Sequence, residues 1–171
     1  MIRGKFLTSR DDTSAVFELR RKVFCEEQGF SAEGEIDEGD RMAVYALAFD
    51  DDGTPIATGR LCIRDDHFTI GRVCVLKPFR GMQVGDFIMR MLLYRAQDLN
   101  AASVYLSAQY DKVDFYRRYG FEPYGEIVSD EGYPHRMMKV DGDKINIEGS
   151  CGCHSKPCEG CQGDCASCGQ N

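Results

Sequence analysis

The sequence has no excess of positive charge and no long apolar run. Its 171 residues include 21 Lys and Arg against 28 Asp and Glu, a formal net charge of −7 at pH 7. Nucleic-acid phosphates require a basic protein surface, so this balance argues against a nucleic-acid partner. No stretch approaches the ~20 apolar residues of a membrane span, and the N-terminal segment MIRGKFLTSRDD lacks the apolar run of a signal peptide. We therefore expect a cytoplasmic protein without a membrane or nucleic-acid partner, while a cationic small molecule remains compatible with the charge.

The cysteines divide the chain into two parts. Cys25, Cys62 and Cys74 are scattered through the body, and the remaining six of the nine lie between Cys151 and Cys168. Apolar residues make up 43% of the chain, enough to fill the core of one compact domain. The sequence therefore predicts a folded domain over residues 1–148 and a cysteine-rich tail over residues 149–171.

The hydrophobic pattern of the body predicts a mixed α/β sheet with flanking helices. An amphipathic helix is expected after Asp12 and another over 84–99, where Ile88, Met91, Leu92 and Arg95 form one stripe beside Phe87. The acidic segment 29–40 is expected to be a loop, and a short helix over 111–119 is expected to end at Gly120. The strands are predicted over 3–8, 42–49, 55–64, 67–76, 103–108, 121–128 and 134–140.

A glycine-containing turn follows the predicted strand 67–76 and opens the long helix. Its sequence is Arg80-Gly81-Met82-Gln83-Val84-Gly85-Asp86. Backbone N–H groups at the positive end of a helix dipole form a phosphate site, and glycines permit close approach of the ligand. The turn lacks the Gly-Lys-Ser/Thr ending of a Walker A motif and the full glycine set of a dinucleotide fold. An ordinary strand-to-helix turn therefore remains an equally good interpretation of these residues alone.

A series of short motifs, in this order and at compatible spacing, resembles the GNAT acetyltransferases, and among them the ElaA-type branch. The resemblance covers residues 1 to about 140. Many family members have glycine where this chain has Gln83. The matching motifs are Leu19-Arg20, Val23-Phe24, Glu27-Gln28, Ile36-Asp37, Ile70-Gly71-Arg72-Val73, Val75, Arg80-Gly81, Val84-Gly85, Val104-Tyr105-Leu106, Ala108-Gln109, Phe115-Tyr116, Gly120-Phe121, Gly132 and Pro134-His135.

The resemblance implies the GNAT acyl-CoA N-acyltransferase fold, with a mostly antiparallel mixed sheet, and acetyl-CoA as co-substrate. A primary amine of a small molecule or peptide would attack the thioester directly. The pantetheine arm would pair with a splayed strand, and the pyrophosphate would lie on the glycine turn. The cofactor-binding residues so implied are Val73, Cys74, Val75, Arg80, Gly81, Gln83, Val84, Gly85, Asp86 and Phe115.

Three side chains are candidates for catalysis: the resemblance implies Tyr116 and His135, and a run of acidic residues suggests Glu35. Tyr116 is the proton donor to the leaving thiolate, a role that suits the ordinary tyrosine pKa of ~10; the alternative is a tyrosine that packs in the core. Glu35, in an acidic segment with Glu33, Asp37, Glu38 and Asp40, is a candidate base; the alternative is a solvated loop. His135 is a second candidate base, because histidine titrates near neutral pH; the alternative is a structural histidine.

The cysteines suggest two further predictions. Cys74, Cys62 and Cys25 are expected to be buried small hydrophobic residues and not acyl-carrying nucleophiles. The tail has the spacing C-x-C-H-x3-C-x2-C-x3-C-x2-C, which is typical of a zinc or iron–sulfur site. A reduced disordered tail and a redox-active disulfide segment are the alternatives. The predicted ligands are Cys151, Cys153, Cys158, Cys161, Cys165 and Cys168, with His154 in reserve.

Two functions are consistent with these patterns. The first is an acetyl-CoA-dependent N-acetyltransferase. The second is a non-catalytic protein that senses acetyl-CoA or metal on the same scaffold. We expect a monomer or homodimer.

Overall fold

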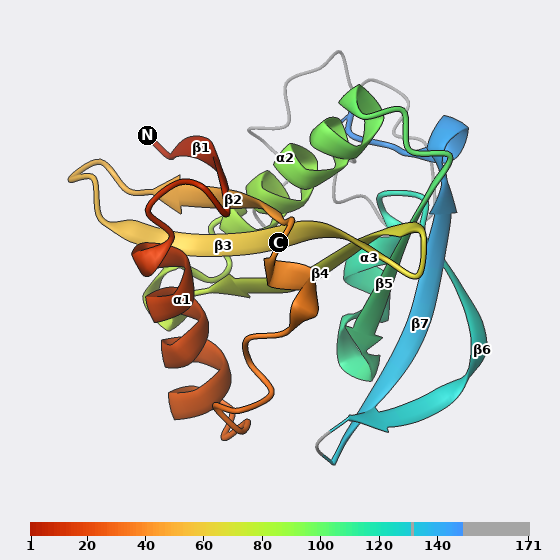
Figure 1. Cartoon of the computed structure of the whole chain (residues 1–171), viewed down its shortest axis with the longest axis horizontal. Coiled ribbons are helices and arrows are strands. Elements are labelled where there is room, and N and C mark those ends of the chain that lie inside the picture. The colour runs from red at the N-terminus through yellow and green to blue at the C-terminus, as the bar shows by residue number, and fades with distance from the viewer. Residues whose placement is uncertain (131, 149–171) are drawn as a thin grey trace, which may run out of the picture.

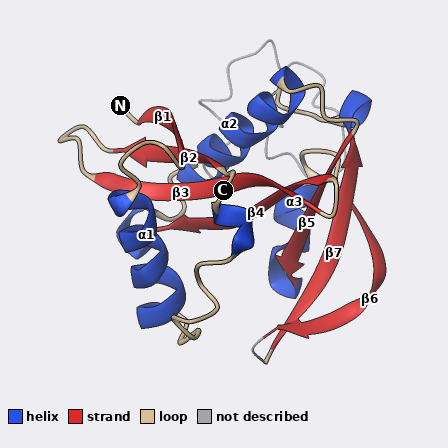
Figure 2. Cartoon of the chain, in the orientation of Figure 1, coloured by secondary structure: helices blue, strands red, loops and turns tan. Residues whose placement is uncertain are grey.

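The computed structural model describes residues 1–130 and 132–148 (Figure 1). Its seven-stranded sheet has the order β1-β2-β3-β4-β5-β7-β6, and every neighbouring pair is antiparallel except β4 and β5 (Figure 2). This confirms the predicted fold class. The strands are β1 (Arg3–Thr8), β2 (Val44–Phe49), β3 (Pro55–Arg64), β4 (His67–Val75), β5 (Ser103–Gln109), β6 (Glu122–Asp130) and β7 (Tyr133–Asp141).

Helices cover both faces of the sheet (Figure 1). Helix α1 (Ser14–Arg20) continues into a π-helical segment, η1 (Arg21–Glu27), and packs with Tyr45 and Leu47 on one face. Helix α2 (Val84–Asp98) packs with Ala46 and Ala48 on the other. Adjacent residues of β2 thus alternate between two cores, as the period of a strand requires. No helix of the described residues is long and apolar enough to cross a membrane.

The buried face of α2 differs from the predicted stripe. Met91 is half-buried, and Arg95 pairs with Asp98 near the surface. The reason is that α2 lies along several strands at once, which buries a wider face than a narrow stripe provides. That face consists of Val84, Ile88, Met89, Leu92, Leu93 and Ala96.

The C-terminal third folds close to expectation. A single 3-10 turn, η4 (Tyr110–Lys112), leads into α3 (Val113–Arg117), which is shorter than the predicted helix. Gly120 follows with φ +92°, and a Cβ there would lie 2.4 Å from the backbone oxygen of Lys144. Glycine is therefore required at this helix end, as predicted.

Strands β4 and β5 separate soon after they meet. Their parallel pairing covers Phe68–Ile70 of β4 and Val104–Leu106 of β5, after which no pairing is present between the described parts of these strands. The cause is a β-bulge in β4: the register with β3 shifts between Thr58 and Arg60, and Arg72 takes φ +54°. The second half of β4 thus leaves backbone groups facing an opening in the sheet.

Candidate active site

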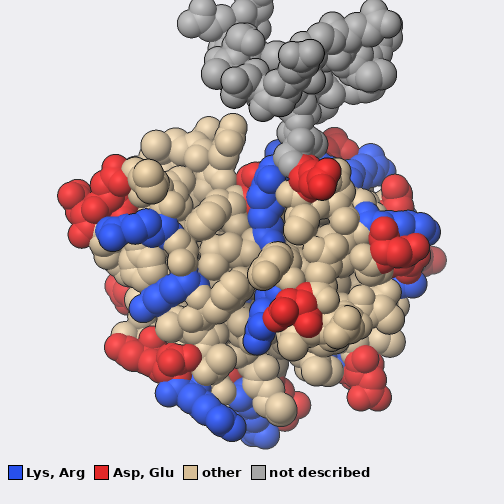
Figure 3. Space-filling model, turned by 90° about the horizontal axis from the view of Figure 1, so that it is seen from above, with Lys and Arg blue, Asp and Glu red and all other residues tan. Residues whose placement is uncertain are grey.

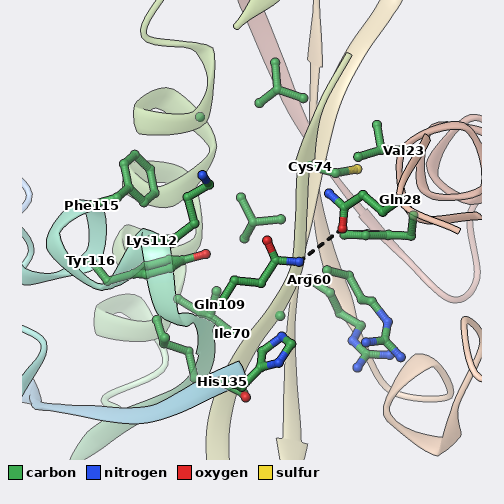
Figure 4. Close-up of a pocket in the computed structure, with 18 of the residues that line it drawn as sticks. Val23, Gln28, Arg60, Ile70, Cys74, Gln109, Lys112, Phe115, Tyr116 and His135 are labelled. Carbon is green, nitrogen blue, oxygen red and sulfur yellow. Dashed lines mark hydrogen bonds between the residues drawn. The ribbon is translucent and has the colours of Figure 1, made fainter. Parts of the chain in front are cut away.

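A cleft of about 950 Å³ occupies the opening between β4 and β5. Its walls come from η1, from Thr69–Val75 of β4, from the glycine turn with the start of α2, and from β5, α3 and β7. Figure 4 shows Phe115 and Tyr116 on one side of the strands and Gln28 and Arg60 on the other. The cleft therefore passes through the sheet, so two ligands can approach each other from opposite faces.

The glycine turn forms one end of the cleft. Gly81 has φ +77° and Gln83 has φ +59°, and both line the cavity. A glycine adopts this left-handed conformation readily, whereas a side chain costs roughly 1–2 kcal/mol, so Gln83 occupies a position that suits glycine. The first N–H groups of α2, at Val84, Gly85 and Asp86, have no partner within their own helix, which begins its bonding with Phe87 N–H to the Gln83 carbonyl. The turn is thus built to bind an anion.

Two charged residues of the turn are already engaged. The guanidinium of Arg80 donates to both carboxylate oxygens of Glu27, at 2.5 and 2.8 Å, and to the Val75 carbonyl at 2.9 Å. The hydrogen bonds from the Arg80 guanidinium lower the pKa of the Glu27 carboxyl. Asp86 accepts from Arg90 Nε and from the Tyr119 hydroxyl, each at 2.6 Å. Both side chains therefore shape the turn, and its backbone is left to bind a ligand.

Tyr116 reaches the cleft from α3. Its ring contacts Phe115 and Phe121 edge-on, with centroid distances of 5.1 and 6.4 Å, and Figure 4 shows its hydroxyl pointing into the cavity. Burial raises the pKa of Tyr116 to about 12. The phenol therefore stays protonated at neutral pH, and it is a weaker acid than the ordinary tyrosine assumed from the sequence.

His135 lies on β7 opposite Gln109 of β5, and both line the cleft. The imidazole is 6% exposed, with Nδ1 3.0 Å from the carbonyl oxygen of Tyr133. A carbonyl can only accept, so Nδ1 carries a hydrogen, and in the neutral imidazole the lone pair is then on Nε2, the tautomer that a base needs. Gln109 Nε2 donates to Gln28 Oε1 at 3.1 Å, which links β5 to the end of η1 (Figure 4).

The acidic segment is not a solvated loop, because its inner carboxylates are held by arginines. Glu35 binds Arg20 and lies 3.1 Å from Arg72. These arginines occupy both of its carboxylate oxygens, and the role of Glu35 as a base remains a prediction. Glu33 and Glu38 are exposed, the latter at the start of a 3-10 turn, Glu38–Asp40.

Two further carboxylates complete this network. Asp40 lies 2.7 Å from Arg20 and 2.9 Å from Arg60, and Asp37 lies 2.7 Å from Arg60. Burial alone would raise the pKa of Asp40, but hydrogen bonds from Arg20 and from the Asp37 backbone hold it well below its usual range. Sequence reasoning gave no role to Arg60. Arg60 lies two residues from both Thr58 and Cys62 in the predicted strand 55–64, so the three side chains point to the same face, and all three are buried. That alternation was the signal available in the sequence.

The cysteines of the body are not suited to carry an acyl group. Cys74 and Cys62 are buried as predicted, and burial raises the pKa of both thiols, that of Cys74 to about 12. A thiol with so high a pKa supplies almost no thiolate at neutral pH. Cys25 is only partly buried, so the prediction of burial was wrong there, because η1 turns this residue toward the surface.

The predicted metal ligands Cys151, Cys153, Cys158, Cys161, Cys165 and Cys168 lie outside the described residues, as does His154. Within residues 1–130 and 132–148, no group of three or more His, Cys, Asp or Glu side chains is arranged to hold a metal ion.

Charge is unevenly distributed over the molecule. Figure 3 shows acidic and basic side chains interspersed over one face, with a group of basic side chains near its middle. Lys112, Arg118 and Arg90 line the end of the cleft near α2 and α3. This end thus combines helix N–H groups with cations, an arrangement suited to phosphates.

Comparison with known proteins agrees with this geometry. The family model "Acetyltransferase (GNAT) domain" matches residues 20–141. An uncharacterized N-acetyltransferase of Bacillus subtilis, YjcF, is 36% identical over 126 residues, which cover 73% of this chain and 89% of the relative. The crystal structure of Escherichia coli ElaA has a TM-score of 0.74 and 30% identity, covering 82% of this chain and all of that one (100%). An acyl-CoA N-acyltransferase of Pseudomonas aeruginosa has a TM-score of 0.74 and 28% identity, covering 82% and 99%.

Proposed function

Because this chain belongs to the GNAT acetyltransferase family, we propose that it transfers the acetyl group of acetyl-CoA to a primary amine by direct attack within the cleft. The family and the solved relatives make it an acyltransferase with an acyl-CoA co-substrate and a small-molecule amine as acceptor. The observation that carries the proposal is the separation of β4 from β5 next to the N-terminus of α2. This separation leaves a strand edge, suited to the pantetheine arm, next to an anion site that is suited to the pyrophosphate.

Each cofactor segment has a counterpart in the cleft. The edge of Val73–Val75 pairs with no strand on the β5 side among the described residues, and its Val75 carbonyl accepts from Arg80 Nε. This edge offers main-chain groups to the amides of the pantetheine arm, as an additional strand would. The turn from Gly81 to Asp86 offers helix N–H groups to the pyrophosphate. Phe115 lines the wall between them. The thioester then lies near the bulge, where a main-chain N–H of β4 can stabilise the oxyanion.

The acid and the base approach from opposite sides of the thioester. His135 Nε2 takes a proton from the acceptor ammonium, and the neutral amine then attacks the carbonyl carbon. As the C–S bond breaks, the Tyr116 hydroxyl donates a hydrogen bond and then its proton to the sulfur. The second proton of the attacking nitrogen returns to the tyrosinate, and His135 releases the first to solvent. Because its pKa of about 12 exceeds that of a thiol, the hydrogen bond contributes more to stabilising the leaving group than complete proton transfer does.

A graded pair of substitutions at Gly85 tests cofactor binding. A Cβ there lies 3.6 Å from Val75 and 3.7 Å from Phe115, which are ordinary contacts, so Gly85→Ala is expected to bind CoA nearly as wild type does. Gly85→Val adds two methyl groups where the pyrophosphate must approach. We expect it to raise the Kd for CoA about 10-fold or more, measured by calorimetry, with little change in thermal stability.

Two outcomes would count against this assignment. Equal CoA affinity in wild type and Gly85→Val would place the pyrophosphate elsewhere. CoA binding without release of thiol across a panel of polyamines, aminosugars, amino acids and peptides would favour the non-catalytic sensor.

The cysteine spacing of the tail supports a separate proposal, that residues 149–171 bind zinc or an iron–sulfur cluster. Cys158, Cys161, Cys165 and Cys168 form two Cys-x2-Cys pairs, and two such pairs complete a tetrahedral set. Protein purified without oxygen is expected to carry about one zinc or one cluster per chain, and replacement of these four by Ser is expected to remove it while acetyl transfer persists. Full-length protein free of zinc and iron would contradict the proposal.

A cytoplasmic location and a monomeric or homodimeric state likewise remain proposals.

A further inference from the structure

The cleft is lined by more cations than carboxylates, although the whole chain has a net charge of −7. Four of these cations lie at the end formed by the glycine turn, α2 and α3. There Arg80 is paired with Glu27 and Arg90 with Asp86, and the phosphates of CoA account for Lys112 and Arg118. The other three lie on the opposite side of β4 and need another explanation. The seven cations are Arg60, Arg64, Arg72, Arg80, Arg90, Lys112 and Arg118, against the three carboxylates Glu35, Asp86 and Asp130.

These three arginines, Arg60, Arg64 and Arg72, belong to a network that carries excess positive charge. With the buried Arg20 they make four guanidiniums, which face the three carboxylates of Glu35, Asp37 and Asp40. The ion-paired groups alone therefore carry a net charge of +1, while Glu33 and Glu38 of the same segment are exposed to solvent.

Asp37 is shared among several guanidiniums. Arg60 lies 2.7 Å, Arg64 3.0 Å and Arg72 3.2 Å from its carboxylate oxygens. Arg60 also pairs with Asp40, and Arg72 also donates to the carbonyls of Gly34 and Glu35. A guanidinium has five N–H donors, so even with these contacts N–H groups remain for a further anion.

Arg60 supplies an independent sign of a missing partner. Its side chain is 4% exposed and lines the cleft. Among the described residues, Arg60 Nε is the one buried side-chain nitrogen or oxygen atom that has no hydrogen-bond partner. Buried donors are nearly always satisfied in folded proteins, so this one points to a ligand. Arg72 adds backbone strain, since its φ of +54° is rare for a side-chain-bearing residue and recurs at binding sites.

We propose that Arg60, Arg64 and Arg72 bind a carboxylate of the acceptor, so that the acceptor is an amine that also carries a carboxylate, as an amino acid does. This inference rests on the proposed function and names its substrate class. Arg60 already holds Asp37 through two N–H···O bonds of 2.7 and 3.1 Å, the paired geometry in which guanidiniums bind planar carboxylates. A polyamine would instead place an ammonium beside guanidiniums of like charge. The acceptor amine would face His135.

The test compares acceptors that differ only in the carboxylate. Acetyl transfer is measured for the common L-amino acids and, for the best of them, for its amide and its decarboxylated amine, with spermidine and O-phosphoethanolamine as further arms. The amino acid is expected to exceed its amide in kcat/KM by about 100-fold, because the site leaves guanidiniums unpaired when the carboxylate is absent.

A matched pair of substitutions assigns the effect to the cleft. Arg64 is 51% exposed and pairs with Asp37 at 3.0 Å, and Arg117 is 52% exposed and pairs with Asp114 at 3.0 Å, but of the two only Arg64 lines the cleft. Arg64→Gln is expected to raise KM for the amino acid about 10-fold. The KM of Arg64→Gln for acetyl-CoA and its activity on the amide are expected to stay within about 2-fold of the wild-type values. All kinetic constants of Arg117→Gln are expected to stay within the same limit.

Several results would overturn the proposal while leaving acetyl transfer itself intact. One such result is a higher kcat/KM for spermidine, for O-phosphoethanolamine or for the amide than for the amino acid. Another is an equal loss of activity on the amino acid and on the amide in Arg64→Gln. Absence of thiol release with every acceptor would reject the proposed function, and the acceptor class with it.

Discussion

Replacement of Tyr116 by Phe is expected to lower kcat about 100-fold and to change the Kd for acetyl-CoA less than about 2-fold. The substitution removes one hydroxyl and keeps the ring that packs against Phe115 and Phe121. The hydroxyl contacts sulfur most strongly when charge develops there, so its loss acts on the transition state and not on binding. Thiol release measures kcat, and calorimetry measures the Kd.

Tyr110→Phe is the control for this experiment. Tyr110 precedes α3, is 56% exposed and is not part of the cleft wall, so its hydroxyl is expected to be dispensable. Because the pKa of Tyr116 is about 12, wild-type kcat is also expected not to decline through tyrosine ionisation up to about pH 10. If Tyr116→Phe and Tyr110→Phe gave the same kcat as wild type, another group would have to protonate the thiolate.

The sequence predicts those parts of the fold that depend on local signals. The predicted strand 55–64 coincides with β3 because turns delimit both of its ends. Gly53 has φ +82°, and Asp65 and Asp66 have φ +49° and +61°, so each turn contains residue types that tolerate the left-handed region. The turn that opens α2 was predictable for the same reason, since its glycines and the helix start are adjacent in the chain.

The acceptor side could not be predicted in this way because its contacts join distant segments. Arg20 meets Asp40 across 20 residues, and Arg72 meets Asp37 across 35. From the sequence, the acidic segment is simply negative and favours a cationic acceptor. In the fold, arginines from α1, β3 and β4 pair with its three inner carboxylates, Glu35, Asp37 and Asp40, so the side of the segment that faces the cleft is no longer negative.

Asp40→Asn is expected to lower the free energy of unfolding by about 3 kcal/mol at pH 7. Asp40 is 8% exposed and accepts hydrogen bonds from Arg20, from Tyr45 at 2.9 Å and from the backbone of Asp37 at 3.0 Å. The amide keeps the shape of the side chain but removes the charge, which leaves the fully buried Arg20 with one carboxylate in place of two. Urea unfolding followed by circular dichroism measures the difference.

The same substitution makes a prediction about pH. The pKa of Asp40 is lowered in the folded state, so its ionised form stabilises the protein above the unfolded-state pKa of ~3.9, and this contribution decreases as the pH falls toward the folded-state value. The difference in stability between wild type and Asp40→Asn is therefore expected to be constant from pH 7 to about 5. Below pH ~3.9 it is expected to narrow by up to about 1.4 kcal/mol per pH unit.

Asp111→Asn is the matched control, because Asp111 is 68% exposed and pairs with Lys112 on the surface. Its effect is expected to stay within about 0.5 kcal/mol at every pH. If Asp40→Asn lost no more stability than Asp111→Asn, the arginines would not depend on this carboxylate for their positions. The excess of positive charge on the acceptor side would then belong to side chains free to rearrange, and the assignment of a fixed carboxylate site to Arg60 and Arg72 would lose its structural basis.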